Sequence, residues 1–136
     1  MSSVNTKVYK NNAWNEAGIG DEAQASLTSD ITLGTGFTDI ISINADPSSR
    51  YYVEAHFDNS HQALGANAAV LHRIVGFDSG NVKKGLAAHT EMVPTRTGTD
   101  YYVSIAMVSG YPKYGLDVSA AGKVLSGAYI KIIKIK

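Results

Sequence analysis

The feature that most constrains the fold of this chain is the alternation of apolar and polar side chains in short segments after residue 36. β-Branched and aromatic residues occupy every second position there, and clusters of Gly, Asp, Asn, Ser and Pro separate the segments. A period of two predicts half-buried β-strands joined by turns. We expect strands at residues 37–44, 50–58, 69–77, 85–94, 100–108, 115–119 and 127–135, with a weaker one at 29–33.

The length of the chain suits one domain, because 136 residues can bury a single core but would leave two domains small. Ala-rich stretches at 66–69 and 119–122 are not followed by the stripe of an amphipathic helix. We therefore predict an all-β sandwich of two antiparallel sheets in residues 29–136. Residues 1–28 form an N-terminal arm or edge segment, with too little periodic apolar surface to join the core.

Charge and composition exclude several classes of partner. The 12 basic and 12 acidic side chains cancel, so no overall field attracts nucleic acid. Cysteine is absent, which removes disulfides and thiolate chemistry from consideration. No apolar run approaches the ~20 residues that span a bilayer. We expect no membrane partner and no specific nucleic-acid partner.

Two expected strands have apolar side chains on both faces. In residues 51–58 the faces are clearly different, since Tyr51, Val53, Ala55 and Phe57 alternate with wettable residues. Residues 101–108 and 128–135 are apolar on both sides, which a two-sheet sandwich does not require. Such strands predict a subunit interface. Our candidate interface residues are Tyr102, Ala106, Val108, Ile130 and Ile132.

Two aromatic segments are similar to each other. Residues 49–55 (SRYYVEA) match residues 99–105 (TDYYVSI) at a spacing of 50. They could be equivalent strands in the two halves of a double Greek key. Chance is the other explanation, since Tyr and Val are common in sheets.

These aromatic strands and the closing segment SGAYIKIIKI, residues 126–135, together resemble the trimeric jelly-roll family. The family includes tumour-necrosis-factor-like and complement-globular-head domains, and its fold recurs in phage fibre heads and capsid decoration proteins. The resemblance covers residues 29–136 and rests on strand order and character. It implies a jelly-roll fold and a homotrimer, with the first strand, the last and a late central one at the threefold axis.

The resemblance also implies a function. The segment KVYKNNAW, residues 7–14, is similar in style to the openings of phage virion modules. We therefore expect a phage virion structural protein on the particle surface, whose partners are its own copies and other virion proteins. Capsid decoration or cement and a fibre or receptor-binding head both fit. No collagen-like or coiled-coil stalk precedes the domain, which favours decoration.

Motifs for chemistry are missing. Gly-x-Ser-x-Gly does not occur, and the Gly pairs at 18–20 and 34–36 lack the remainder of a phosphate loop. The four histidines form no metal-ligand pair, so we interpret them as surface or loop residues: His56, His61, His72 and His89. We expect no enzyme activity, no catalytic residue, no bound metal and no cofactor.

The alternative function is that of a stand-alone carbohydrate-binding lectin, recognising a host-surface glycan. Oxygen-rich turns can hold Ca²⁺ or sugar hydroxyls, although Asp and Asn also form turns without a ligand. The candidate loops are 58–67 and 78–84, with exposed Tyr52, Tyr111 and Tyr114 as stacking rings. The candidate ligand residues are Asp58, Asn59, His61, Asp78 and Asn81.

The two ends of the chain carry further candidates. Tyr9 and Trp14 are large apolar residues in a polar setting, and an arm lying on a neighbour would bury them as assembly anchors. Alternatively, residues 6–10 add an edge strand and Trp14 closes one end of the sandwich. The last segment has four lysines, Lys123, Lys131, Lys134 and Lys136, which are typical of a protected edge strand.

Overall fold

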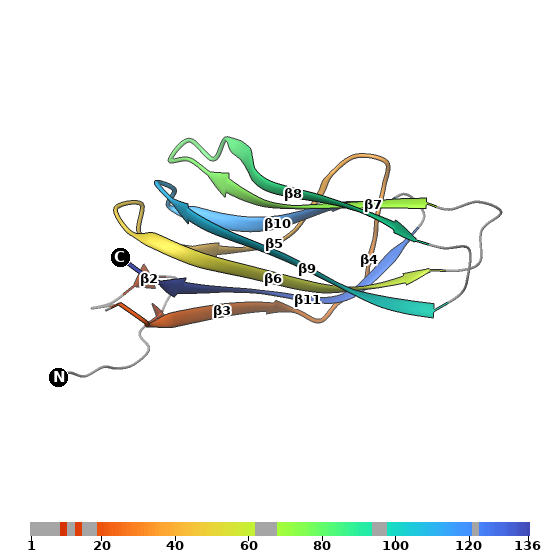
Figure 1. The fold of residues 1–136 in the computed structure, drawn as a ribbon, viewed down its shortest axis with the longest axis horizontal. Coiled ribbons are helices and arrows are strands. Elements are labelled where there is room, and N and C mark those ends of the chain that lie inside the picture. The colour runs from red at the N-terminus through yellow and green to blue at the C-terminus, as the bar shows by residue number, and fades with distance from the viewer. Residues whose placement is uncertain (1–8, 11–12, 15–18, 62–67, 94–97, 121–122) are drawn as a thin grey trace.

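The computed structural model describes residues 9–10, 13–14, 19–61, 68–93, 98–120 and 123–136. Its eight long strands form two antiparallel sheets (Figure 1). Sheet I contains, in spatial order, β3 (Glu22–Leu27), β11 (Val124–Lys134), β6 (Arg50–His61) and β9 (Gly98–Ser109). Sheet II contains β5 (Thr38–Asn44), β10 (Lys113–Ser119), β7 (Ala68–Phe77) and β8 (Lys83–Val93).

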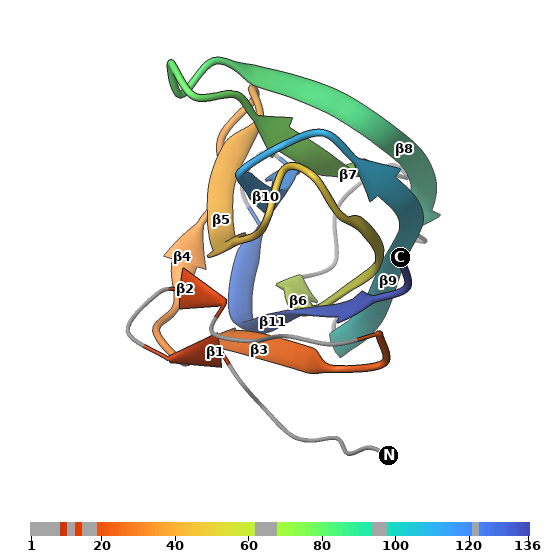
Figure 2. The same ribbon diagram turned by 90° about the vertical axis from the view of Figure 1, so that its left-hand side faces the viewer.

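The strand pairing is that of a jelly roll. Among the eight long strands the first pairs with the last, β3 with β11, and the second with the seventh, β5 with β10. The third pairs with the sixth, β6 with β9, and the fourth with the fifth, β7 with β8. The two sheets enclose one core (Figure 2). The predicted all-β jelly-roll sandwich is therefore confirmed.

Short strands complete the described structure. β4 (Ile31–Thr32) pairs with β11 beside the β6 contact, and β1 (Tyr9–Lys10) pairs with β2 (Ala13–Trp14) in a separate hairpin. The seven main predicted strands correspond to β5 to β11, and the weaker one contains β4. No helix in the described part of the chain is long and apolar enough to cross a membrane.

Strand β3 is the strand of the two sheets that the sequence did not predict. It pairs with β11 over six residues at one edge of sheet I. Ala23 is buried, and Ala25 and Leu27 pack against the core. The expectation that residues 1–28 contribute nothing to the core is therefore wrong at this strand.

The core is built from the inward faces of the two sheets. The predicted inward face of β6 is confirmed, since Tyr51, Val53, Ala55 and Phe57 are all buried. Tyr51 meets Tyr114 of sheet II edge to face, with ring centroids 6.1 Å apart. Aromatic pairs of this geometry add stabilisation beyond the area they bury.

The inward face of β9 differs from the expectation. Tyr102 and Ser104 are buried, and Ala106 and Val108 pack against the core. On β11, Ile130 and Ile132 are fully buried in the same core. The assignment of Tyr102, Ile130 and Ile132 to a subunit interface is wrong, because their own chain already covers them.

The two similar aromatic segments face opposite ways. Tyr51 points into the core, whereas Tyr101, its counterpart at a spacing of 50, is 80% exposed. β6 and β9 are antiparallel neighbours in which Tyr51 pairs with Val108. Equivalent strands would place matching residues on the same side, so the similarity reflects shared β-strand composition.

The lysines near the end of the chain do not protect an edge. β11 lies inside sheet I, with β3 and β4 on one side and β6 on the other. Lys131 extends over the sheet to within 4.0 Å of Glu54, and Lys123 is buried just before the strand. The edge-strand interpretation of this segment is therefore wrong.

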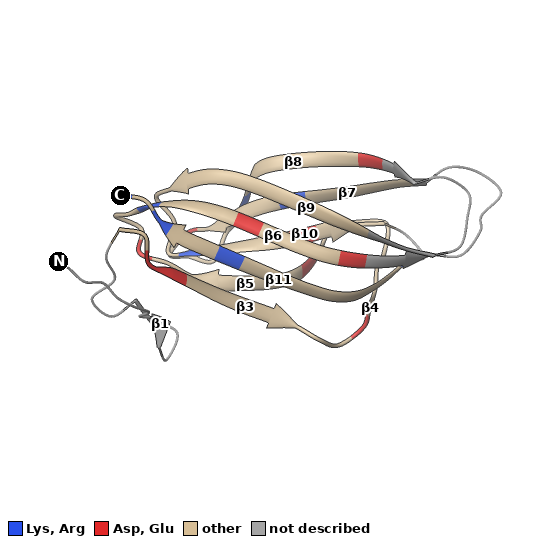
Figure 3. Ribbon diagram, turned by 60° about the horizontal axis from the view of Figure 1, so that its bottom comes forward, with Lys and Arg blue, Asp and Glu red and all other residues tan. Residues whose placement is uncertain are grey.

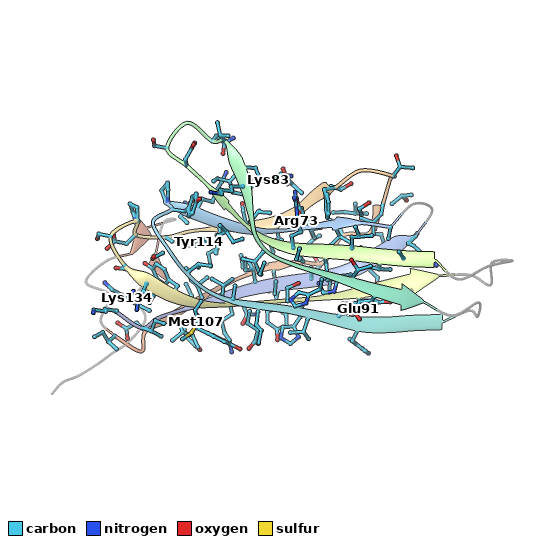
Figure 4. All side chains as sticks on the ribbon, turned by 45° about the horizontal axis from the view of Figure 1, so that its top comes forward. Arg73, Lys83, Glu91, Met107, Tyr114 and Lys134 are labelled. Atoms are coloured by element: carbon cyan, nitrogen blue, oxygen red, sulfur yellow. The ribbon has the colours of Figure 1, made fainter. Side chains whose placement is uncertain are left out.

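A cluster of charges lies on the outer side of sheet II (Figure 4). Asp117 is fully buried and accepts two hydrogen bonds from Arg73, from Nε at 2.9 Å and from Nη2 at 2.7 Å. Lys83 Nζ lies 2.9 Å from the same carboxylate and 2.7 Å from Asp39. The pKa of Arg73 is raised by its hydrogen bonds to Asp117, against the opposing effect of burial. The cluster connects β5, β7, β8 and β10.

Candidate binding surface on sheet I

The outer face of sheet I changes from polar to apolar across its strands. One row runs Ser26, Tyr129, His56, Val103, and the next runs Gln24, Lys131, Glu54, Ile105. Because side chains alternate along each strand, these cross-strand rows share the solvent side of the sheet. The polar residues lie toward β3 and the apolar ones on β9.

Strand β9 presents an apolar stripe, which we define as Val103, Ile105 and Met107. These side chains are 45%, 49% and 70% exposed, and the labelled Met107 lies on the outer side in Figure 4. In the described sheets β9 pairs only with β6, so it is an edge strand. No charged residue occurs from 101 to 109, and this part of the strand is tan in Figure 3, without the blue or red of charged residues.

A hydrogen-bonded group occupies the middle of the face. Glu54 accepts from His56 Nε2 at 2.7 Å and from the Tyr52 hydroxyl at 3.1 Å, and the Tyr129 hydroxyl lies 3.4 Å away. Partial burial acts to raise the pKa of Glu54. The hydrogen bonds from His56 and Tyr52, with the charge of Lys131, outweigh it and lower the pKa. Glu54 is thus a fixed anion that orients its neighbours.

Beside this group the face is hollowed above Gly127. The hollow has a volume of about 400 Å³ and is lined by Ser26, His56, Phe57, Asp58, Tyr101, Gly127, Ala128 and Tyr129. A β-bulge lies between Leu125 and Gly127, where β11 changes register against β6. Bulges often redirect side chains at functional sites. Here the bulge brings a residue without a side chain between Asp58 and β3.

The structure separates the predicted ligand residues. Asp58 lies in strand β6 and lines the hollow, while the side chains of Asn59 and His61 are outside the described residues. Asp78 accepts hydrogen bonds from the backbone N–H groups of Gly80 and Val82, and Asn81 has the positive φ of a turn residue. The β7–β8 turn is thus satisfied by itself.

The described end of β6 lies beside the start of β7, whereas the turn at 78–82 follows the end of β7 (Figure 1). Among the described residues, Asp58 and Asp78 therefore do not lie in one site. Of the predicted stacking rings, Tyr114 is wrong: it is fully buried, and this burial raises its pKa to about 12. Tyr111 is half-buried over Gly76, and Tyr52 is half-buried beside Glu54.

A second polar cluster lies between the sheets, around His72. The ring of His72 is fully buried, so its assignment to the surface is wrong. Nδ1 contacts the Ser104 hydroxyl, and Nε2 lies 3.2 Å from Glu91. The His72 imidazole thus contacts a hydroxyl through one nitrogen and a carboxylate through the other, which is the arrangement found in acyl-transfer enzymes. Ser104 is also fully buried, so a substrate cannot reach its hydroxyl.

The burial of His72 predicts a loss of stability in acid. Burial lowers the pKa of His72 below 6.5, although Glu91 acts to raise it and His89 to lower it. The unfolded chain then binds a proton more readily, so stability falls as the pH drops through 6.5 toward the folded pKa. We expect His72→Phe to be less stable at neutral pH but to show a shallower fall between pH 7 and 5 in urea titrations.

Above pH 7 the imidazole is neutral in both states, so the two stability curves should run parallel there. This region is the internal control. Curves that stay parallel down to pH 5 would contradict the assignment of the acid response to His72.

The predicted anchors Tyr9 and Trp14 lie in the β1–β2 hairpin, where they pair with each other. Their side chains are outside the described residues, so the anchor role stays a prediction. In the described pairing, β1 joins neither sheet of the sandwich. The predicted edge strand at residues 6–10 is therefore not part of the sandwich where the structure describes it.

Comparison with known proteins finds similarity of fold alone. No protein-family model matches the chain, and no curated protein matches its sequence. A chain of the T13 particle of infectious bursal disease virus is similar in structure, with a TM-score of 0.59 over 96% of this chain at 8% identity. A chain of the same virus, strain Gx, has a TM-score of 0.56 over 98% at 9% identity. This chain spans 36% and 38% of those two chains. At such identities the likeness is one of fold.

Proposed function

We propose that this chain is a non-enzymatic structural subunit on the surface of a phage particle, as a capsid decoration or cement protein or a fibre head. The observation that carries the proposal is the exposed apolar stripe on edge strand β9. The structural likeness to chains of a virus particle supports it.

The exposed apolar stripe supports the proposal that another surface covers β9. An exposed edge strand offers unpaired backbone groups, and natural proteins protect such edges with charges, proline or a covering element. β9 has no proline and no charge from residue 101 to residue 109, and it adds three apolar side chains to the open edge. A second copy of the chain would cover both, so we assign the self-association surface of the proposed homotrimer to the part of β9 that carries Val103, Ile105 and Met107.

The His72 cluster supports a role without catalysis. A catalytic nucleophile must meet its substrate, and Ser104 lies in the core. Among the described residues no group of three or more His, Cys, Asp or Glu could hold a metal ion.

The assembly role predicts that Ile105→Lys yields a folded monomer. Light scattering at micromolar concentration should give three times the 14.5 kDa chain mass for the native protein and a single chain mass for the variant. The added charge stays in water on a monomer but would be desolvated in the interface. The matched control is Thr90→Lys, which places the same charge on the exposed part of edge strand β8 and should leave the mass unchanged.

A native protein of single-chain mass would contradict self-association through β9. The place on the particle needs a separate measurement. Immunogold electron microscopy of purified particles should label the capsid for a decoration protein and the fibre tip for a fibre head. Particles without label would contradict the virion role.

A further inference from the structure

The hollow over Gly127 is a formed feature of the sheet surface. Gly127 supplies the floor, Tyr101 and the His56–Tyr129 pair stand around it, and Asp58 adds a carboxylate. Its volume of about 400 Å³ lies at the lower end of the range for small-molecule sites, about 300–1,000 Å³. Tyr101 is 80% exposed, so its ring is available to a ligand.

The walls of the hollow are held in place. His56 and Tyr129 stack with centroids 4.4 Å apart and planes within 13°. Glu54 holds the polar ends of both rings, His56 Nε2 and the Tyr129 hydroxyl. Along β6, Glu54 lies on one side of His56 and Asp58, which lines the hollow, on the other. Because His56 Nε2 and the Tyr129 hydroxyl are directed to Glu54, they point away from the hollow. A ligand therefore meets a fixed and mainly apolar wall.

The chemistry of the lining selects among ligands. It contains one carboxylate and no lysine or arginine, which disfavours phosphates and other anions. Within the described part of the chain no hydrogen bond or ion pair engages the Asp58 carboxylate, so it can accept hydroxyl protons in strong O–H···O⁻ bonds. The Ser26 hydroxyl adds one more polar group.

We propose that this hollow binds a neutral hexose unit of a glycan. The C–H face of the sugar packs on Tyr101, and two of its hydroxyls donate to Asp58. A cation can bind over a single aromatic face, but the stacked His56 and Tyr129 cover one face of each other, and Tyr101 is the ring that stands exposed. One free ring face beside one carboxylate suits a sugar better. The site lies on the sheet and not in loops 58–67 and 78–84.

The test is saturation-transfer NMR on the full chain with the methyl glycosides of glucose, galactose and mannose. We expect at least one to bind with a Kd on the order of 1 mM, with ¹⁵N shift changes centred on Asp58 and Gly127. Choline serves as the cationic probe and should not bind. Tyr101→Ala should weaken glycoside binding at least tenfold, and Val82→Ala, which is 63% exposed in the β7–β8 turn, should leave it unchanged.

A second variant fills the floor. A Cβ at residue 127 would lie 3.8 Å from the Leu27 carbonyl oxygen and 3.9 Å from Asp58 Oδ2, both ordinary contacts. The Cβ of Gly127→Val therefore has room, and we expect its two methyl groups to occupy the hollow and abolish binding. Absence of binding by all three glycosides, binding of choline that Tyr101→Ala abolishes, or unchanged glycoside binding in Gly127→Val would each overturn the proposal.

The sugar site does not depend on the assembly role. Ile105→Lys, the variant designed to be monomeric, should bind the glycoside with the affinity of the native protein. Loss of assembly with sugar binding intact, or the reverse, thus identifies which of the two proposals has failed.

Discussion

Replacing Arg73 by methionine is expected to lower the free energy of unfolding by about 3 kcal/mol, the lower end of the range for breaking a buried ion pair. Methionine retains most of the apolar stem of Arg73 but removes both hydrogen bonds to Asp117. That carboxylate is fully buried, and among the described residues it would keep Lys83 as its one ion-pair partner. Urea unfolding followed by circular dichroism measures the loss.

Asp39→Asn is the matched control for this variant. Asp39 bonds the same Lys83, but its side chain is 60% exposed. Exposed pairs contribute roughly 0–1 kcal/mol, so the control should stay within that range. Equal losses in Arg73→Met and Asp39→Asn would show that burial of Asp117 does not set the energetics of the cluster.

The second large effect is expected for Tyr102→Ala, at about 3–5 kcal/mol of unfolding free energy. Tyr102 stacks on Phe57 with centroids 5.0 Å apart and lies 5.8 Å from the ring of His72. Removing the ring opens a cavity between the sheets. Thermal and urea unfolding of the variant both report the loss.

Tyr101→Ala is the control, because it removes the same side chain one residue earlier on the outer face. Surface substitutions usually change stability by within about 0.5 kcal/mol, and we expect that here. If Tyr101→Ala were the more damaging of the two, the facing of β9 described above would be reversed.

Most strands could be predicted because alternation records which side chains are buried. β6 is the clearest case, since its wettable residues leave one choice of inward face. β3 was missed because its inward residues include Ala23 and Ala25, and alanine gives little hydrophobic contrast with serine or glutamine.

Alternation fails on β9 because both of its faces are apolar. Larger residues occupy the outer face, while Ser104 on the inner face contacts His72. The choice between the faces is made by partners on β6 and β7, which local sequence does not specify. The hypothesis of an interface at β9 came from the sequence, but which of its residues face outward could not be assigned.

The candidate sugar site could be predicted only in part. Asp58 was a candidate from its residue type, but Tyr101, Gly127 and Tyr129 come from other strands. The register of β9 and β11 against β6 brings them together. The contact between Arg73 and Asp117 likewise joins residues 44 positions apart.

The pairing of β3 with β11 also fixes where the sandwich starts and stops. The Gly20 amide bonds the Lys134 carbonyl at 2.6 Å, and the Lys134 amide bonds the Asp21 carbonyl at 2.9 Å. The polypeptide thus enters and leaves the sandwich at neighbouring points of one end. A domain with adjacent ends can be inserted into a surface loop of another protein without separating the two sides of that loop. This jelly roll is therefore suited to insertion into another protein as one unit.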